Sequence, residues 1–160
     1  MGKEGTLSKM DPCPSCGAVW EDGQDCQQRF DECLALEFSH PTFGAVHHLT
    51  VPAFMLQHSG KLTTEGAQAM LDILHLFLVK HASPSHVRAT YSGILDNKQR
   101  GWKFTKTSSA VLIDSNIWTC TISSVTMESG EKYCETIKDW AWSVYRDGAA
   151  AMPTLNKEKK

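Results

Sequence analysis

The stretch 63-TTEGAQAMLDILHLFLVK-80 decides the fold of this chain. Either of its first two threonines can cap a helix, because a threonine hydroxyl accepts a hydrogen bond from a free amide of the first turn. From Met70 onward the residues are apolar on nearly every helical face, interrupted only by Asp72 and His75 before the closing lysine. A helix that is apolar nearly all round is buried among other elements. The sequence therefore predicts a central, buried helix over about 63–80.

Helical periodicity is also found on both sides of this stretch. Apolar residues spaced by three and four predict helices over about 24–38 and 131–146, and a shorter helix is expected over about 85–95. A further helix over about 42–57 contains Pro52, which removes a backbone donor and crowds the preceding turn, so we expect a kink or two abutting helices. The predicted fold class is mainly α, a compact bundle of about five helices.

Two features remain outside this helical pattern. Residues 96–129 show little helical periodicity, and within them 117–125 mixes Thr, Ile and Trp, as in a strand or an irregular return. Gly148 is expected to stop the last helix, because glycine favours C-terminal caps. The predicted organisation is a flexible leader over 1–10, a single helical metal-binding domain over 11–150, and a flexible charged tail over 151–160.

Composition and charge narrow the class of protein. The chain has 160 residues, of which 41% are hydrophobic and 21% charged, as in a soluble globular protein. Its formal net charge of −2 comes without clustered Lys and Arg, so we expect no nucleic-acid partner. Neither a secretory signal nor an apolar stretch long enough for a bilayer is visible, which predicts a cytoplasmic location without a membrane partner. The six cysteines are then expected to be reduced.

The strongest local signal is Cys13-Pro-Ser-Cys16-Gly. Two thiolates three positions apart on a turn can both reach one tetrahedral ion, which predicts an N-terminal Cys-x-x-Cys zinc knuckle. One such pair is only half of a site. A redox dithiol is the alternative, but that motif usually opens a helix after a strand, and no strand is expected here.

The missing ligands are sought among Cys26, His47, His48 and His58. Cys26 follows Cys16 by a short loop and starts a predicted helix, so it is the expected third ligand. His47 and His58 share one face of an unbroken helix, but eleven residues of helix rise about 16 Å, so they cannot bind one ion unless Pro52 bends the helix. We expect His47 to be the fourth ligand and keep His58 as a candidate. Each histidine can instead cap a helix or satisfy the core.

Two polar residues, Asp72 and His75, lie three apart in the central helix. Buried polar groups need partners, so they either satisfy each other, orient a metal-bound histidine, or act as an acid–base pair. The remaining cysteines, Cys33, Cys120 and Cys134, are expected to be small core residues.

The order of motifs resembles an uncharacterised, mostly bacterial family, a domain of unknown function with a CPxCG … HxLTV … QH signature. The pieces that carry the resemblance are Cys13-Pro-x-Cys16-Gly, Cys26, Leu36-Glu37-Phe38, His40-Pro41, His47-x-Leu49-Thr50-Val51 and Gln57-His58, with similar pieces near 71–79, 121–125 and 138–145. The resemblance covers nearly the whole chain past residue 12. It implies a single domain, no known activity, and a set of positions to watch: Cys13, Cys16, Cys26, His47 and His58.

The chain also departs from the family pattern. Pro52 stands where the family tends to have Asp, and Ser59 stands where it has Pro. Asp72 and Tyr133 stand where histidines are found in later helices of the family. If those histidines form a catalytic centre in relatives, this chain is an altered or inactive member.

Three functions follow as hypotheses. The first is a zinc-binding helical protein whose zinc is structural and whose helical surface binds an unknown protein or a small molecule. The second is a zinc-dependent enzyme of hydrolase or lyase type with an open metal position, in which His58 or Asp72 serves as general base. The third is a thiol redox protein that uses Cys13 and Cys16.

Overall fold

The computed structural model describes residues 11–21, 23–90 and 113–152. The predicted leader, nearly all of the predicted tail and the end of the predicted 85–95 helix lie outside these ranges. The α-helices are α2 (Cys26–Ser39), α3 (Pro41–Gly44), α4 (His47–Gln57), α5 (Thr64–Leu78), α6 (Pro84–Thr90) and α8 (Gly130–Ala151). Short 3-10 turns are η1 (Ser59–Lys61), η3 (Ser115–Ile117) and η4 (Ile122–Ser124). The mainly α class is confirmed, with slightly more helices than expected and no strand in the described ranges.

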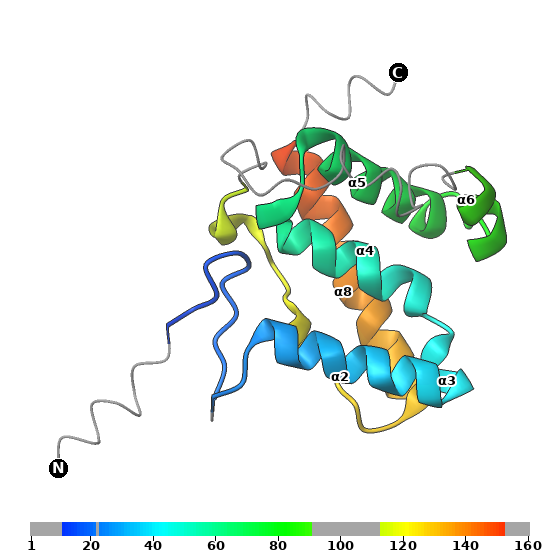
Figure 1. The fold of residues 1–160 in the computed structure, drawn as a ribbon, viewed down its shortest axis with the longest axis horizontal. Helices are drawn as coiled ribbons and strands as arrows, with labels where there is room; N and C mark the ends of the chain where they lie inside the picture. The colour runs from blue at the N-terminus through cyan, green and yellow to red at the C-terminus, as the bar shows by residue number, and fades with distance from the viewer. Residues whose placement is uncertain (1–10, 22, 91–112, 153–160) are drawn as a thin grey trace, which may run out of the picture.

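Helix α4 lies between α5 and α8, and these three helices form the centre of the bundle (Figure 1). The side chain of Thr63 caps α5 by accepting a hydrogen bond of 3.0 Å from the Gly66 amide, as the sequence predicted. Leu71 and Leu74 of α5 are fully buried, as is Trp140 of α8. The prediction of a central helix over about 63–80 is therefore confirmed.

The break in the predicted 42–57 helix falls at Ala45 and Val46, because α3 ends at Gly44 and α4 starts at His47. Two abutting helices are therefore found, but their junction lies before Pro52, and α4 runs through this proline without interruption. The start of α4 is fixed from outside: Glu37 of α2 accepts hydrogen bonds from His47 and Thr50 in its first turns. Tertiary contacts, and not the proline, decide where the helix begins.

Helix α8 continues past Gly148 to Ala151, so the prediction that Gly148 ends it is wrong. A Cβ atom at this position would lie 3.1 Å from Leu56 Cδ2 and 3.5 Å from Leu71 Cδ1. The missing side chain therefore lets α8 approach α4 and α5 closely, which is a packing role and not a capping one.

The described part of the irregular stretch, 113–129, is a return built from η3, η4 and extended residues. Gln57 fastens it to the bundle: its side-chain Nε2 donates to the Cys120 carbonyl at 2.6 Å, and its Oε1 accepts from Trp140 Nε1 at 3.0 Å. Both partners of Gln57 lie far from it along the chain. The return is thereby held beside the N-terminal loop, as Figure 1 shows for the yellow and blue segments.

The other predicted core cysteines differ in burial. Cys33 is 0% exposed, whereas Cys120 and Cys134 are half-buried and pack against the edge of the core. Among the described helices, none combines the length and the apolar character that crossing a membrane requires.

Candidate metal centre

The N-terminal knuckle is a tight turn held by its own backbone. The Cys13 amide donates to the Ala18 carbonyl and the Gly17 amide donates to the Cys13 carbonyl, both at 2.8 Å. Gly17 has φ +85°, a left-handed conformation that other residues adopt only with strain. This turn presents Cys13 and Cys16 on one side, as the Cys-x-x-Cys-Gly spacing predicted.

The 113–129 return packs against the knuckle and hydrogen-bonds to it. Trp118 Nε1 donates to the Ser15 carbonyl at 3.2 Å. The Ser115 carbonyl lies 3.5 Å from the point where a Cβ atom on Gly17 would be. The knuckle is thus docked between this return, the start of α2 and the end of α4.

Cys26 is the first residue of α2, whose N-terminus is capped by Asp25 through a 2.8 Å hydrogen bond from the Gln28 amide. The positive end of a helix dipole favours a thiolate at this position. Trp20 Nε1 donates to Cys26 Sγ at 3.2 Å, and Cys16 Sγ lies 3.5 Å away. Cys26 therefore sits in surroundings that stabilise the negative sulfur.

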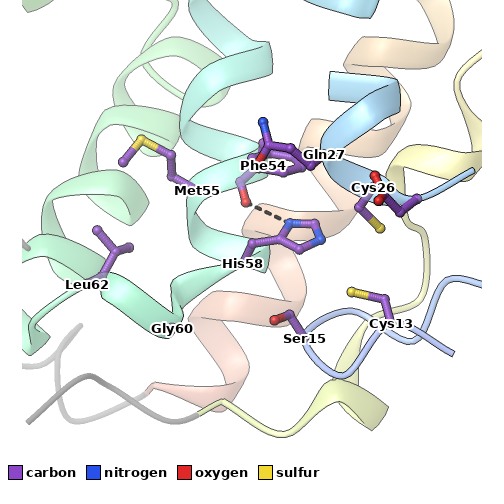
Figure 2. Close-up of a pocket in the computed structure, with 10 residues that line it drawn as sticks. Cys13, Ser15, Cys26, Gln27, Phe54, Met55, His58, Gly60 and Leu62 are labelled. Atoms are coloured by element: carbon purple, nitrogen blue, oxygen red, sulfur yellow. Dashed lines mark hydrogen bonds between the residues drawn. The ribbon is translucent and has the colours of Figure 1, made fainter. Parts of the chain in front are cut away.

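His58 caps the C-terminal end of α4 and points its ring toward the cysteines (Figure 2). Its Nδ1 donates to the Phe54 carbonyl at 3.0 Å, which leaves the lone pair on Nε2. Nε2 is buried and has no hydrogen-bond partner among the described atoms. The Phe54 ring stacks on the imidazole at a centroid distance of 4.1 Å and fixes its plane. A neutral imidazole oriented by a carbonyl on its far nitrogen is a prepared metal ligand.

The ligand atoms of Cys13, Cys16, Cys26 and His58 all lie within 4.8 Å of one another. In a tetrahedral zinc site with bonds near 2.3 Å, ligand atoms are ~3.7 Å apart, so small side-chain rotations would close these four on one ion. Three thiolates and one imidazole form a donor set that suits zinc. The buried Nε2 without a partner fits the same group, since an ion would satisfy it.

Hydrogen bonding within the cluster separates its thiol pKa values. The pKa of Cys26 falls to about 4 mainly because Cys16 hydrogen-bonds to it, and the Trp20 donor acts in the same direction. The pKa of Cys16 rises, chiefly through the same hydrogen bond and then through burial. The pair therefore loses a first proton easily and a second one reluctantly. A cation bound between the sulfurs would replace that second proton.

The structure does not place His47, the expected fourth ligand, with the cysteines. His47 begins α4, at the helix end opposite His58, and its Nδ1 donates to Glu37 Oε1 at 2.7 Å. The knuckle meets the C-terminal end of α4, so the rise of the helix keeps His47 away from it. His48 also lies outside the cluster, with its ring against Phe77 at 4.4 Å. Burial, and then the charges of His47 and Lys138, lower the His48 pKa.

Asp72 and His75 of α5 also lie outside the cluster. Gln68 Nε2 donates to Asp72 Oδ1 at 2.6 Å, and His75 Nδ1 hydrogen-bonds to the Tyr145 hydroxyl at 2.6 Å. Asp72 and His75 therefore each have a hydrogen-bond partner other than one another.

A cavity of about 480 Å³ opens beside the centre (Figure 2). Its lining residues are Cys13, Ser15, Asp25, Cys26, Gln27, Phe54, Met55, His58, Gly60 and Leu62. Three of the four cluster residues therefore line this cavity, and Cys16 is not among its lining residues.

Two residues that build this site were not predicted from the sequence. Trp20 supplies a hydrogen-bond donor to a ligand sulfur, and Gln57 fastens the return that carries the knuckle. A tryptophan six residues before a candidate ligand was the available signal for the first. Nothing in the spacing of Gln57 indicates its two partners, because both are more than sixty residues away along the chain.

The fold and the cluster define a class, that of small helical proteins with a Cys3His group of metal-ligand geometry. The chain belongs to the family of unknown function DUF5946, whose model matches residues 11–149. No curated protein and no solved structure matches the chain. The predicted membership of a domain-of-unknown-function family is thereby confirmed, and the structure is compatible with a metal-binding helical protein.

Proposed function

We propose that this protein is a zinc protein in which Cys13, Cys16, Cys26 and His58 hold one structural Zn²⁺. The observation that carries the proposal is His58 Nε2, a buried lone pair that faces three thiols and has no other partner. Four protein ligands leave no open position, which is typical of structural zinc. The ion would tie the knuckle to the start of α2 and the end of α4, and the helical surface would bind a protein or small-molecule partner.

The test is metal content and spectroscopy on the full chain. Protein purified from zinc-supplemented medium should contain one zinc per chain, and its cobalt form should show tetrahedral thiolate bands that azide and cyanide leave unchanged. Cys16→Ser should lose both the metal and the cooperative unfolding transition. The matched control is Cys33→Ser, a buried cysteine outside the cluster, which should keep the metal.

Two outcomes would replace this proposal. Cobalt bands that shift with azide or cyanide would show an open coordination position on the metal, as in a zinc-dependent enzyme. The cavity beside Cys13 and Cys26 is the observation that favours this second candidate. Absence of metal together with a reversible Cys13–Cys16 disulfide would favour thiol redox chemistry instead.

A further inference from the structure

The three thiols of the cluster differ in their access to solvent. Cys16 is 2% exposed and Cys26 is 5% exposed, whereas Cys13 is only half-buried. Cys13 and Cys26 line the cavity and Cys16 does not. A molecule inside the cavity can therefore approach Cys13 most easily.

The thiols also differ in hydrogen bonding. Cys26 Sγ accepts from Trp20 Nε1 at 3.2 Å, and the Cys16 and Cys26 sulfurs hydrogen-bond to each other at 3.5 Å. Within the described residues, no hydrogen bond to Cys13 Sγ is found. Donors to a thiolate take up part of its charge and reduce its nucleophilicity. Cys13 thus retains the most charge for attack.

The cavity indicates what could reach this sulfur. Phe54, Met55 and Leu62 give the cavity apolar lining, and Asp25 adds a carboxylate. The Asp25 carboxylate disfavours an anionic ligand. A volume of about 480 Å³ lies in the range of small-molecule sites. The walls fit a small, uncharged molecule with an apolar body.

We propose that Cys13 is the reactive thiolate of the centre and takes an alkyl group from a small, uncharged alkyl donor held in this cavity. The sulfur lone pair forms a new S–C bond while the bond from that carbon to its leaving group breaks, and the leaving group departs with the electron pair. Cys13 becomes a neutral thioether, and no oxidant or reductant is needed. This inference rests on the proposed metal centre, in which Cys13 is one of the three sulfur ligands.

The test is site-resolved alkylation of the metal-loaded full chain, after its zinc content has been measured. Iodoacetamide is added for timed intervals, and each cysteine is quantified by peptide mass spectrometry. We expect Cys13 to react about tenfold faster than Cys16 or Cys26. Iodoacetate should be slower than iodoacetamide at Cys13 by a larger ratio than at glutathione, because the Asp25 carboxylate lines the cavity.

Trp20→Phe isolates the hydrogen-bond argument, since it keeps an aromatic ring and removes the donor to Cys26. Cys26 should become several-fold more reactive in this variant, while Cys13 keeps its rate. Equal rates at all three cysteines of zinc-loaded protein, or an unchanged Cys26 rate in Trp20→Phe, would overturn the inference and leave the metal centre standing. A chain without zinc would instead contradict the proposed function itself.

Discussion

The two ends of α4 carry the same residue type in opposite situations. At the N-terminal end His47 donates to Glu37, whose side chain is 0% exposed and also accepts from Thr50 and Tyr133, at 2.5 Å each. At the C-terminal end His58 Nε2 is buried with no hydrogen-bond partner and faces three thiols. The first arrangement is complete by itself, whereas the second needs one more group.

The comparison teaches how to separate a structural histidine from a candidate ligand. A buried carboxylate is costly unless donors satisfy it, and Glu37 has three. Burial, and then the hydrogen bond to Glu37, raise the Tyr133 pKa, so this hydroxyl keeps its proton and remains a donor. A satisfied network stabilises the fold, and an unsatisfied buried atom indicates a site for an ion.

The largest expected effect separates the two histidines directly. Structural zinc contributes about 10–16 kcal/mol over four ligands, so His58→Ala should lose about 4 kcal/mol of zinc affinity, roughly a thousandfold. His47→Ala, the matched control on the same helix, should bind zinc like the wild type. Competition with a chromophoric chelator measures both. Equal affinities of the two variants would show that His58 is not a ligand.

The next largest effect is expected from removing Glu37, the acceptor of the hydrogen-bond network at the N-terminal end of α4. Glu37→Leu should lower the free energy of unfolding by about 3 kcal/mol, because it leaves buried donors without an acceptor. Zinc content should stay at the wild-type value. Glu32→Leu on the same helix is the control: Glu32 is exposed and pairs with Arg29 at 3.4 Å, so its loss should cost less than about 1 kcal/mol. Urea unfolding would measure both, and similar losses would refute the buried role of Glu37.

A smaller change removes one donor from the same network. Tyr133→Phe keeps the ring, which packs on Phe43 at 4.9 Å, and deletes the hydroxyl that donates to Glu37. Because Glu37 keeps two other donors, the expected loss is about 1 kcal/mol of unfolding free energy. Chemical denaturation at constant zinc would detect it. A loss as large as that of Glu37→Leu would mean that the hydroxyl alone carries the network.

The smallest effect concerns the pH dependence of stability near this end of α4. Burial lowers the His48 pKa below its usual 6.5, so below that pH the unfolded chain binds more protons at this position than the folded chain. Stability contributed by neutral His48 is therefore complete above pH 6.5 and is lost as the pH falls toward the folded pKa. His48→Phe should flatten this slope of unfolding free energy against pH.

Phe77→Leu is the control for the His48 prediction, because it alters the ring contact of 4.4 Å without removing a titratable group. It should change the stability and keep the slope. Urea unfolding between pH 5 and pH 8 would compare the three proteins. Identical slopes for wild type and His48→Phe would exclude His48 as a source of the pH dependence.

Much of the fold was readable from the sequence. The central helix, its Thr63 cap and the first helix were predicted within a few residues, because apolar periodicity and capping are local properties. The break in the 42–57 helix and the end of the last helix were misplaced. Contacts of Glu37 with α4, and the close approach of α8 at Gly148, decided both.

The candidate site likewise has a part that the sequence predicted and a part that it did not. The sequence alone determined the Cys13–Cys16 knuckle and Cys26 at a helix start, since both depend on short spacings. Only the tertiary structure showed that His58, at the C-terminal end of α4, lies beside the cysteines and that His47 does not. Trp118 and Gln57 dock the knuckle at the C-terminal end of α4 through contacts that span more than sixty residues, and no local pattern encodes such contacts.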